Sequence, residues 1–148
     1  EKEKKYAASF IIISSILFFI GVLFGYYLIA PLSVQFFASY IVSPEISNSI
    51  DIDSYISLMK TSAIASGLLF ELPIIIFFLT KIGLVTPEFL RKYRKYTLII
   101  VLILSAVITP PDVISQVIVA IPIMILYEAS ILISVLVVKS QEKEKLKA

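Results

Sequence analysis

Two acids lie inside long apolar stretches of the sequence, where a carboxyl group has no obvious access to water. Glu71 interrupts the stretch GLLFELPIII, and Pro73 follows it two residues later. Glu128 lies in a second stretch, residues 113–138. An ionised acid in hydrocarbon costs a few kcal/mol, so each acid is expected either to serve a function or to be held protonated by internal hydrogen bonds.

A smaller polar set surrounds the sequence TPPD, residues 109–112. Pro110 and Pro111 stop one helix, and Asp112 can cap the next. Thr109 and Gln116 are then expected to face each other across the turn as a polar patch. A capped hairpin explains these residues nearly as well as a binding site does, so both interpretations stay open.

Two residue types that are common in catalytic and metal sites are missing. The chain has no cysteine and no histidine, which excludes disulfides, thiolate metal sites and His-based catalysis within it. It contains no HExxH, GxSxG or phosphate-loop motif, and its four glycines are scattered. We therefore expect no enzyme activity, no cofactor and no metal. An intramembrane hydrolase would lack its nucleophile.

Composition places these residues in a membrane. Hydrophobic residues make up 59% of the chain and charged residues 16%, which is typical of an all-α polytopic membrane protein. We expect one membrane domain, residues 1–148, and a flexible cytoplasmic tail at 139–148. Four transmembrane helices are predicted, at 6–30, 54–81, 87–109 and 112–138.

The helix ends follow from local chemistry. The third span is short, because its apolar part covers only about 14 residues, or roughly 21 Å, and it forms a short hairpin with the fourth. Thr86 suits an N-cap before Pro87, and Asp53 or Ser54 can cap the second span. PLSVQFFASYI, residues 31–41, is expected to form an interfacial helix.

Basic residues predict the orientation. Twelve of the thirteen lie before the first span, between the second and third, or after the fourth. The positive-inside rule makes that side the cytoplasm, so both termini are expected there. The run RKYRK, residues 91–95, is interpreted as a topology determinant beside anionic lipid rather than a nucleic-acid site.

Helix packing suggests roles for the buried polar residues. Ala63 and Gly67 lie one and two turns before Glu71, a face that suits the approach of another helix. The alternative is a protonated, internally bonded structural Glu71. Ser130 and Ser134 offer Glu128 structural partners, and its role stays open. The pair Gly21 and Gly25 is typical of close helix packing.

Three motifs carry a family resemblance. Residues 70–73 (FELP), 83–92 (GLVTPEFLRK) and 104–116 (LSAVITPPDVISQ) resemble TatC, the C subunit of the twin-arginine protein translocase. The resemblance runs from Glu1 to about Ser134. Family members have six spans, so it implies that this chain supplies spans three to six and lacks an N-terminal part, either truncated or a separate piece.

The resemblance implies a function and partners. Such a subunit of the cell (inner) membrane receives twin-arginine signal peptides of folded cargo and recruits the single-span subunits TatA and TatB. Export is driven by the proton-motive force. Self-association is possible.

The resemblance also implies roles for individual residues. Glu3 matches a signal-peptide contact, and its carboxylate suits guanidinium binding. Glu71, Thr109 and Gln116 match positions where partner helices dock.

A second function stays open at this point. The chain could be a fragment of a proton-coupled solute transporter that uses Glu71 and Glu128 as proton carriers. An inverted repeat would favour that function, and we find none in the sequence. The translocase is therefore the leading hypothesis.

Overall fold

The computed structural model describes residues 2–39 and 51–148, except for the side chains of residues 2 and 3. The described residues form helices and turns without a strand. Three helical segments, Lys4–Ser39, Ile52–Lys81 and Val113–Lys147, are long and apolar enough to cross a membrane. Large apolar side chains such as Ile11, Phe19 and Ile125 are more than half exposed, as lipid-facing residues are. The protein is an all-α polytopic integral membrane protein.

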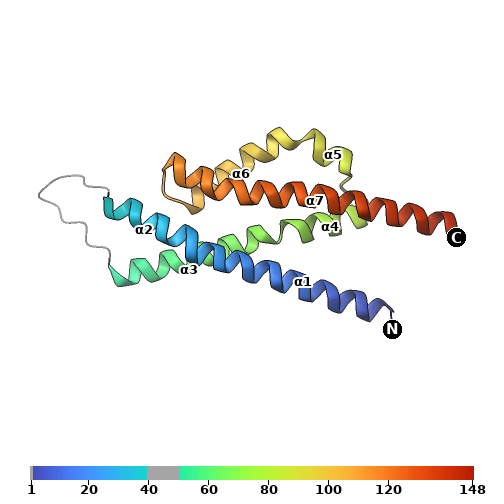
Figure 1. The fold of residues 1–148 in the computed structure, drawn as a ribbon, viewed down its shortest axis with the longest axis horizontal. Helices are drawn as coiled ribbons and strands as arrows, with labels where there is room; N and C mark the ends of the chain where they lie inside the picture. The colour runs from blue at the N-terminus through green and yellow to red at the C-terminus, as the bar shows by residue number, and fades with distance from the viewer. Residues whose placement is uncertain (1, 40–50) are drawn as a thin grey trace, which may run out of the picture.

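The first rod continues past its expected end. Helix α1 (Lys2–Phe24) leads into a π-helical turn, η1 (Gly25–Ile29), and then into α2 (Ala30–Ser39), and Figure 1 shows one rod. The expected separate helix at 31–41 is therefore a continuation of the first, and its last two positions lie outside the described residues. The wider turn accommodates Pro31, because Ala30 donates its N–H five residues back, to Gly25.

The second rod is divided at Glu71. Helix α3 (Ile52–Phe70) ends there and α4 (Leu72–Lys81) begins one residue later. The N-cap position of α3 is Asp51, without a side-chain cap bond, so the predicted cap at Asp53 or Ser54 is wrong by two or three residues. Those residues lie instead in the first turn of the helix.

The third predicted span is two helices. Helix α5 (Pro87–Lys92) has Thr86 as its N-cap, whose hydroxyl accepts the N–H of Phe89 at 3.2 Å, as expected. Tyr93 then separates it from α6 (Arg94–Ile108). With 15 residues, α6 is about 22 Å long.

The last helix, α7 (Val113–Lys147), is the longest of the described helices. It includes residues 139–147, which were expected to form a flexible tail. The Lys, Glu, Gln and Leu residues there are strong helix formers and extend the helix. In addition, Gln141 donates to the carbonyl of Lys81 at 2.9 Å. This bond joins the end of α7 to the end of α4.

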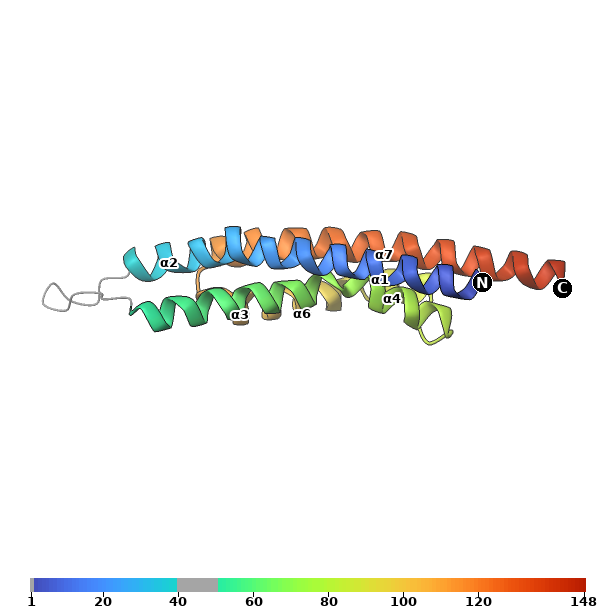
Figure 2. The same ribbon diagram turned by 90° about the horizontal axis from the view of Figure 1, so that it is seen from below.

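The helices pack side by side. Helix α1 lies along α3, and α7 lies between α4 on one side and α5 and α6 on the other (Figures 1 and 2). A buried cluster of Ile29, Val101, Val119 and Ile123 joins η1 to α6 and α7. The N- and C-termini lie at the same end of the molecule (Figure 1).

Candidate functional site

Gly21 and Gly25 bring α1 directly against α3. A methyl group added at Gly21 would lie 2.7 Å from the carbonyl oxygen of Ser66 and 2.8 Å from the Cα atom of Gly67. The buried hydroxyl of Ser66 donates to the carbonyl of Gly21 across this contact. The prediction that the glycine pair marks close helix packing is confirmed.

Glu71 occupies the break between α3 and α4. Its N–H bonds to the carbonyl of Leu68 at 3.2 Å, and its own carbonyl accepts from Ile74 at 3.0 Å and Ile75 at 3.1 Å. Pro73 lacks the N–H that would continue the helical ladder. Regular helix therefore stops at the residue before the acid and resumes at the residue after it.

The side chain of Glu71 is half-buried and points toward α1. Ser14 donates its hydroxyl to the Oε2 atom of Glu71 at 2.8 Å. The Oε1 atom is buried and has no hydrogen-bond partner among the described residues. The bond to Ser14 is what a structural role predicts, and a docking role could use the unbonded oxygen only after the packing around it had opened.

The face that Glu71 shares with Ala63 and Gly67 is already occupied. A Cβ atom at Gly67 would lie 2.8 Å from the ring of Phe18 and 3.0 Å from the side chain of Val22. The prediction that this face suits the approach of another helix is confirmed at Gly67, but that helix is α1 of the same chain, so the face is not open to a partner's helix there. Gly21 and Gly25 of α1 allow this close contact, because they have no side chain between the two helices.

Thr109 and Gln116 lie on the hairpin of α6 and α7. Thr109 is buried and donates to the carbonyl of Ser105 at 2.7 Å. Gln116 is half-buried and donates its Nε2 to the carbonyl of Leu102 at 2.8 Å. The Gln116 bond joins α7 to α6 near their turn, whereas the Thr109 bond closes the end of α6 itself.

The turn itself, between Ile108 and Val113, is short and capped. Pro110 is buried and Pro111 is exposed, and the N–H of Asp112 reaches the carbonyl of Pro110 at 2.6 Å. The Asp112 carboxylate accepts the N–H of Ser115 at 3.1 Å and its hydroxyl at 2.9 Å. These bonds, the backbone one first, lower the pKa of the Asp112 carboxyl below its ordinary 3.8.

Glu128 has a charged partner on α6. Arg94 donates from Nη2 to Glu128 Oε2 at 2.7 Å, and the two side chains are 49% and 47% exposed. The predicted partners Ser130 and Ser134 are engaged elsewhere. Ser130 bonds to the carbonyl of Leu126, and Ser134 pairs with Thr80 of α4 at 2.9 Å.

The sequence analysis did not identify Ser14 and Arg94 as the partners of Glu71 and Glu128. Their distance along the helices from the nearest helix ends could have indicated the pairing. Ser14 lies nine residues beyond Lys5, and Glu71 lies ten residues before Lys81, so antiparallel helices place them at similar depth. Arg94 lies 15 residues before Thr109, and Glu128 lies 15 residues after Val113. Counting from the shared turn would have paired the last two.

Glu3 belongs to α1 by its backbone, and its side chain lies outside the described residues. The structure therefore does not place its carboxylate.

Comparison with known proteins identifies the family. Residues 1–122 match the family model of the Sec-independent protein translocase protein, TatC. The chain belongs to the TatC family. Members of that family are components of a protein translocation system.

Relatives from several bacteria share much of the sequence. The TatC protein of Blattabacterium sp. subsp. Periplaneta americana is 43% identical over 141 residues, which cover 95% of this chain and 53% of that protein. TatCy of Bacillus subtilis is 42% identical over 134 residues, covering 90% and 53%. The chain thus spans about half the length of these TatC relatives.

Solved TatC structures have the same fold. A crystal structure of the twin-arginine translocase receptor TatC superimposes with a TM-score of 0.70 at 36% identity, covering 93% of this chain and 60% of that one. A second structure of the receptor, in DDM, gives a TM-score of 0.69 over 88% and 58%. The arrangement of α1 to α7 is that of the corresponding part of TatC.

Proposed function

We propose that this chain acts within the core and signal-peptide receptor component of the twin-arginine protein translocase, which exports folded proteins by using the proton-motive force. The family match over residues 1–122 is the observation that carries this function. The chain is then a binding and assembly component and not an enzyme. Its environment is the inner membrane of the cell.

Glu71 supports partner docking through its unused oxygen. Because Oε1 is buried and has no partner among the described residues, a polar group on a partner's transmembrane helix would satisfy it once the packing of α1 against this face opened. Such interhelical bonds contribute about 0.6 to 2 kcal/mol in membranes. We assign this role to contacts with the single-span subunits TatA and TatB.

Thr109 and Gln116 form the second proposed docking point. Gln116 is half-buried, and its amide retains a carbonyl oxygen that can accept a bond while Nε2 holds Leu102. Thr109 is buried and serves by fixing the turn. A partner helix would therefore meet Gln116 first.

Glu3 is proposed to bind the paired arginines of a signal peptide. Its position in the first turn of α1 puts it beside the basic residues at the end of the molecule where both termini lie (Figure 1). A carboxylate binds guanidinium through charge-assisted, bidentate hydrogen bonds. The structure leaves this side chain undescribed, so its chemistry and family match support the proposal.

Four segments are proposed to cross the membrane, with both termini in the cytoplasm. Three long segments, Lys4–Ser39, Ile52–Lys81 and Val113–Lys147, qualify by length and composition, and α5 with α6 forms the short third crossing. Cysteines introduced at Ser47 and Asp112 should react with a membrane-impermeant reagent from outside the cytoplasm, and one at Gln141 should not. Labelling of Gln141 from outside would reverse the orientation.

Export by the complete protein tests the function. A cell without its own C subunit is supplied with the full-length protein that contains this segment, and export of a folded reporter with a twin-arginine signal is measured. Export is expected, and a reporter with both arginines changed to lysine should remain inside. Equal export of the two reporters, or of neither, would contradict the proposed function. Glu3→Gln should reduce export of the first reporter.

A further inference from the structure

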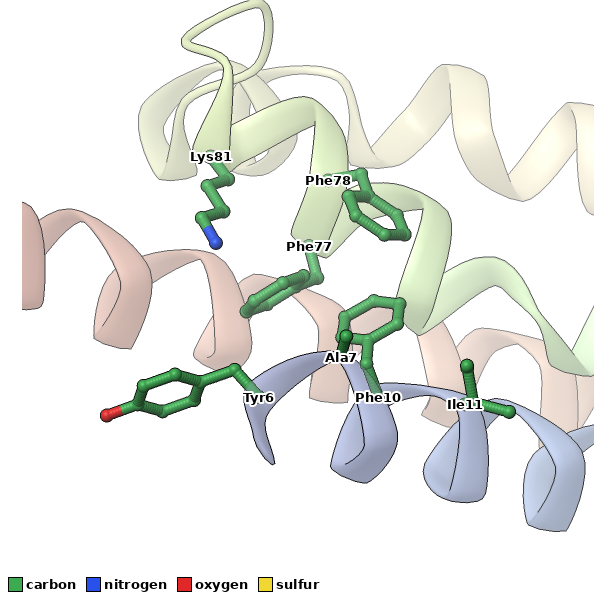
Figure 3. Close-up of a pocket in the computed structure, with 7 residues that line it drawn as sticks. All are labelled: Tyr6, Ala7, Phe10, Ile11, Phe77, Phe78 and Lys81. Atoms are coloured by element: carbon green, nitrogen blue, oxygen red, sulfur yellow. The ribbon is translucent and has the colours of Figure 1, made fainter. Parts of the chain in front are cut away.

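A recessed apolar surface lies between the beginning of α1 and the end of α4 (Figure 3). We call it the α1–α4 pocket; it encloses about 560 Å³, a volume within the usual range of ligand sites. Its lining residues come from one turn or more of each helix: Tyr6, Ala7, Phe10, Ile11, Phe77, Phe78 and Lys81.

Aromatic rings form the floor of the pocket. The ring centroid of Phe10 lies 4.4 Å from that of Phe78 and 5.0 Å from that of Phe77. Half of Phe78 and most of Ile11 remain exposed, so the rings are accessible from the side of the bundle. In a membrane protein this side faces hydrocarbon, and an acyl chain is the apolar group available there.

Among the residues that the structure describes, Lys81 is the one charged residue that lines the α1–α4 pocket. It lies in the last turn of α4, and its Nζ atom is 5.9 Å from the centroid of the Phe77 ring. Figure 3 shows the side chain extending alongside Phe77. Within the described part of the chain the Lys81 ammonium forms no ion pair, so its charge is available to a ligand.

A second hollow adjoins the first. It encloses about 510 Å³, shares Tyr6, Phe77 and Lys81 with the α1–α4 pocket, and continues to α7 through residues such as Leu136 and Val137. Lys81 therefore lies where two mainly apolar hollows meet. Glu144 lines the second hollow but not the first and would repel an anion there, so a negative group is expected on the side of Lys81 that faces the α1–α4 pocket.

We propose that the α1–α4 pocket and the adjoining hollow bind one anionic diacyl phospholipid. Its phosphate would lie against Lys81 Nζ, with one acyl chain in the α1–α4 pocket and the other in the adjoining hollow. Basic pockets between helices at the cytoplasmic surface are where anionic head groups bind. Tyr6, which is 75% exposed, lies at the same level, as aromatic residues at a membrane interface do. The lipid would join α1, α4 and α7 at the end of the molecule where both termini lie.

A single tryptophan makes this site measurable. The chain has no tryptophan, so Phe78→Trp places one fluorophore in the pocket, and Ile16→Trp places one on the exposed lipid-facing side of α1. Each variant is reconstituted in vesicles in which brominated phosphatidylglycerol or brominated phosphatidylcholine replaces part of an unbrominated phosphatidylcholine bilayer. Quenching gives the relative occupancy of the two lipids beside each tryptophan.

At Phe78→Trp we expect phosphatidylglycerol to be favoured about fivefold over phosphatidylcholine, the factor that ~1 kcal/mol for one basic side chain represents. The ratio should stay near one at Ile16→Trp. Adding Lys81→Gln to Phe78→Trp should bring the ratio close to one. Adding Lys95→Gln, an exposed lysine of α6 outside the pocket, should leave it unchanged.

Three results would overturn the proposal. The first is equal ratios at the two tryptophan positions, and the second is a ratio that Lys81→Gln does not lower. The third is quenching at Ile16→Trp with none at Phe78→Trp, which would mean that a protein segment covers the pocket. None of these results bears on export, so the lipid site and the proposed function can fail separately.

Discussion

The two acids of the apolar stretches have opposite surroundings. Glu71 stands in a break between two helices; one of its oxygens accepts from the hydroxyl of Ser14, and the other is buried with no partner among the described residues. Glu128 lies within an unbroken helix, is about half exposed, and pairs with Arg94 at 2.7 Å. A carboxyl group with a neutral partner and an unused oxygen can take a new partner. A carboxylate already bound to guanidinium has less to gain.

The two regions are also held together differently. Around Glu71, α1 and α3 meet at glycines of α1 where even an added Cβ atom would lie less than 3 Å from the backbone of α3. Around Glu128, α6 and α7 are joined by separate side-chain bonds, from Arg94 to Glu128 and from Gln116 to the carbonyl of Leu102. A close backbone contact tolerates no added atoms, whereas separate bonds are lost one at a time. Substitutions should therefore have larger effects in the first region.

The largest effect is expected from Gly21→Leu. Even a methyl group there would lie 2.7 Å from a backbone oxygen, so α1 and α3 must separate. We expect a loss at or above the upper end of the ~1–3 kcal/mol that overpacking usually costs. The unfolding free energy in mixed detergent micelles, titrated with SDS, measures it.

Ser15→Leu is the matched control, because Ser15 is exposed on the same helix. It should change the unfolding free energy little. Equal losses for the two variants would show that the glycine contact does not set the stability of the first region.

Glu71→Ala should lower crosslinking to TatA or TatB in the complete protein. Loss of an interhelical bond of about 0.6 to 2 kcal/mol corresponds to roughly a 3- to 30-fold change. Glu71→Gln keeps the hydrogen-bonding capacity and should retain much of both crosslinking and export. Site-specific photocrosslinking and an export assay measure the two quantities.

The proton-carrier function predicts a different result, because an amide cannot titrate. Abolished export with unchanged crosslinking in Glu71→Gln would exclude docking and favour proton transfer. Ser14→Ala sharpens the comparison: it frees Oε2 without removing the acid. Partner crosslinking should then stay at or above the level of the unchanged protein.

A smaller effect is expected from the Arg94–Glu128 pair. Since both side chains are about half exposed, solvent screening limits their coupling to about 1 kcal/mol or less. A double-mutant cycle with Arg94→Gln and Glu128→Gln measures the coupling from unfolding free energies. Arg91→Gln, exposed in α5, should show no coupling to Glu128→Gln.

Export provides the second measurement on this pair. We expect Glu128→Gln to leave export nearly intact, because the pair fastens two helices of the chain. Loss of export together with unchanged stability would instead give Glu128 a direct role in transport and remove the contrast with Glu71.

Local features were predictable from the sequence. The Thr86 cap before Pro87 and the glycine pair on α1 depend on residues that act within a turn or on one helix face. The FELP and TPPD motifs led to the correct family. Such features need no knowledge of how distant segments align.

Features that depend on alignment between helices were not predictable in the same way. Ser14 reaches Glu71 across 57 positions and Arg94 reaches Glu128 across 34, so the partner depends on helix register. The rod from α1 to α2 was also missed, because a π-helical turn absorbs Pro31 where a break was expected. The sequence also did not show which helix would occupy the face beside Glu71, because that too depends on how α1 aligns with α3.

The smallest effect is expected at Asp112, in the turn outside α6 and α7. Its pKa is lowered in the folded state by the Ser115 bonds, so its contribution to stability is present above its ordinary pKa of 3.8 and is lost as the pH falls through the lower folded value. Asp112→Ala should therefore be slightly less stable than the unchanged chain at neutral pH, with a gap that narrows below pH 3.8. Asp112→Asn keeps a neutral cap acceptor, so its gap to Asp112→Ala should not depend on pH. Thermal unfolding in detergent over this pH range measures both gaps. A constant gap between the unchanged chain and Asp112→Ala would mean that the hydrogen bonds stabilise the hairpin without help from the charge. Among the described side-chain bonds of the second region, the Arg94–Glu128 pair alone would then depend on charge.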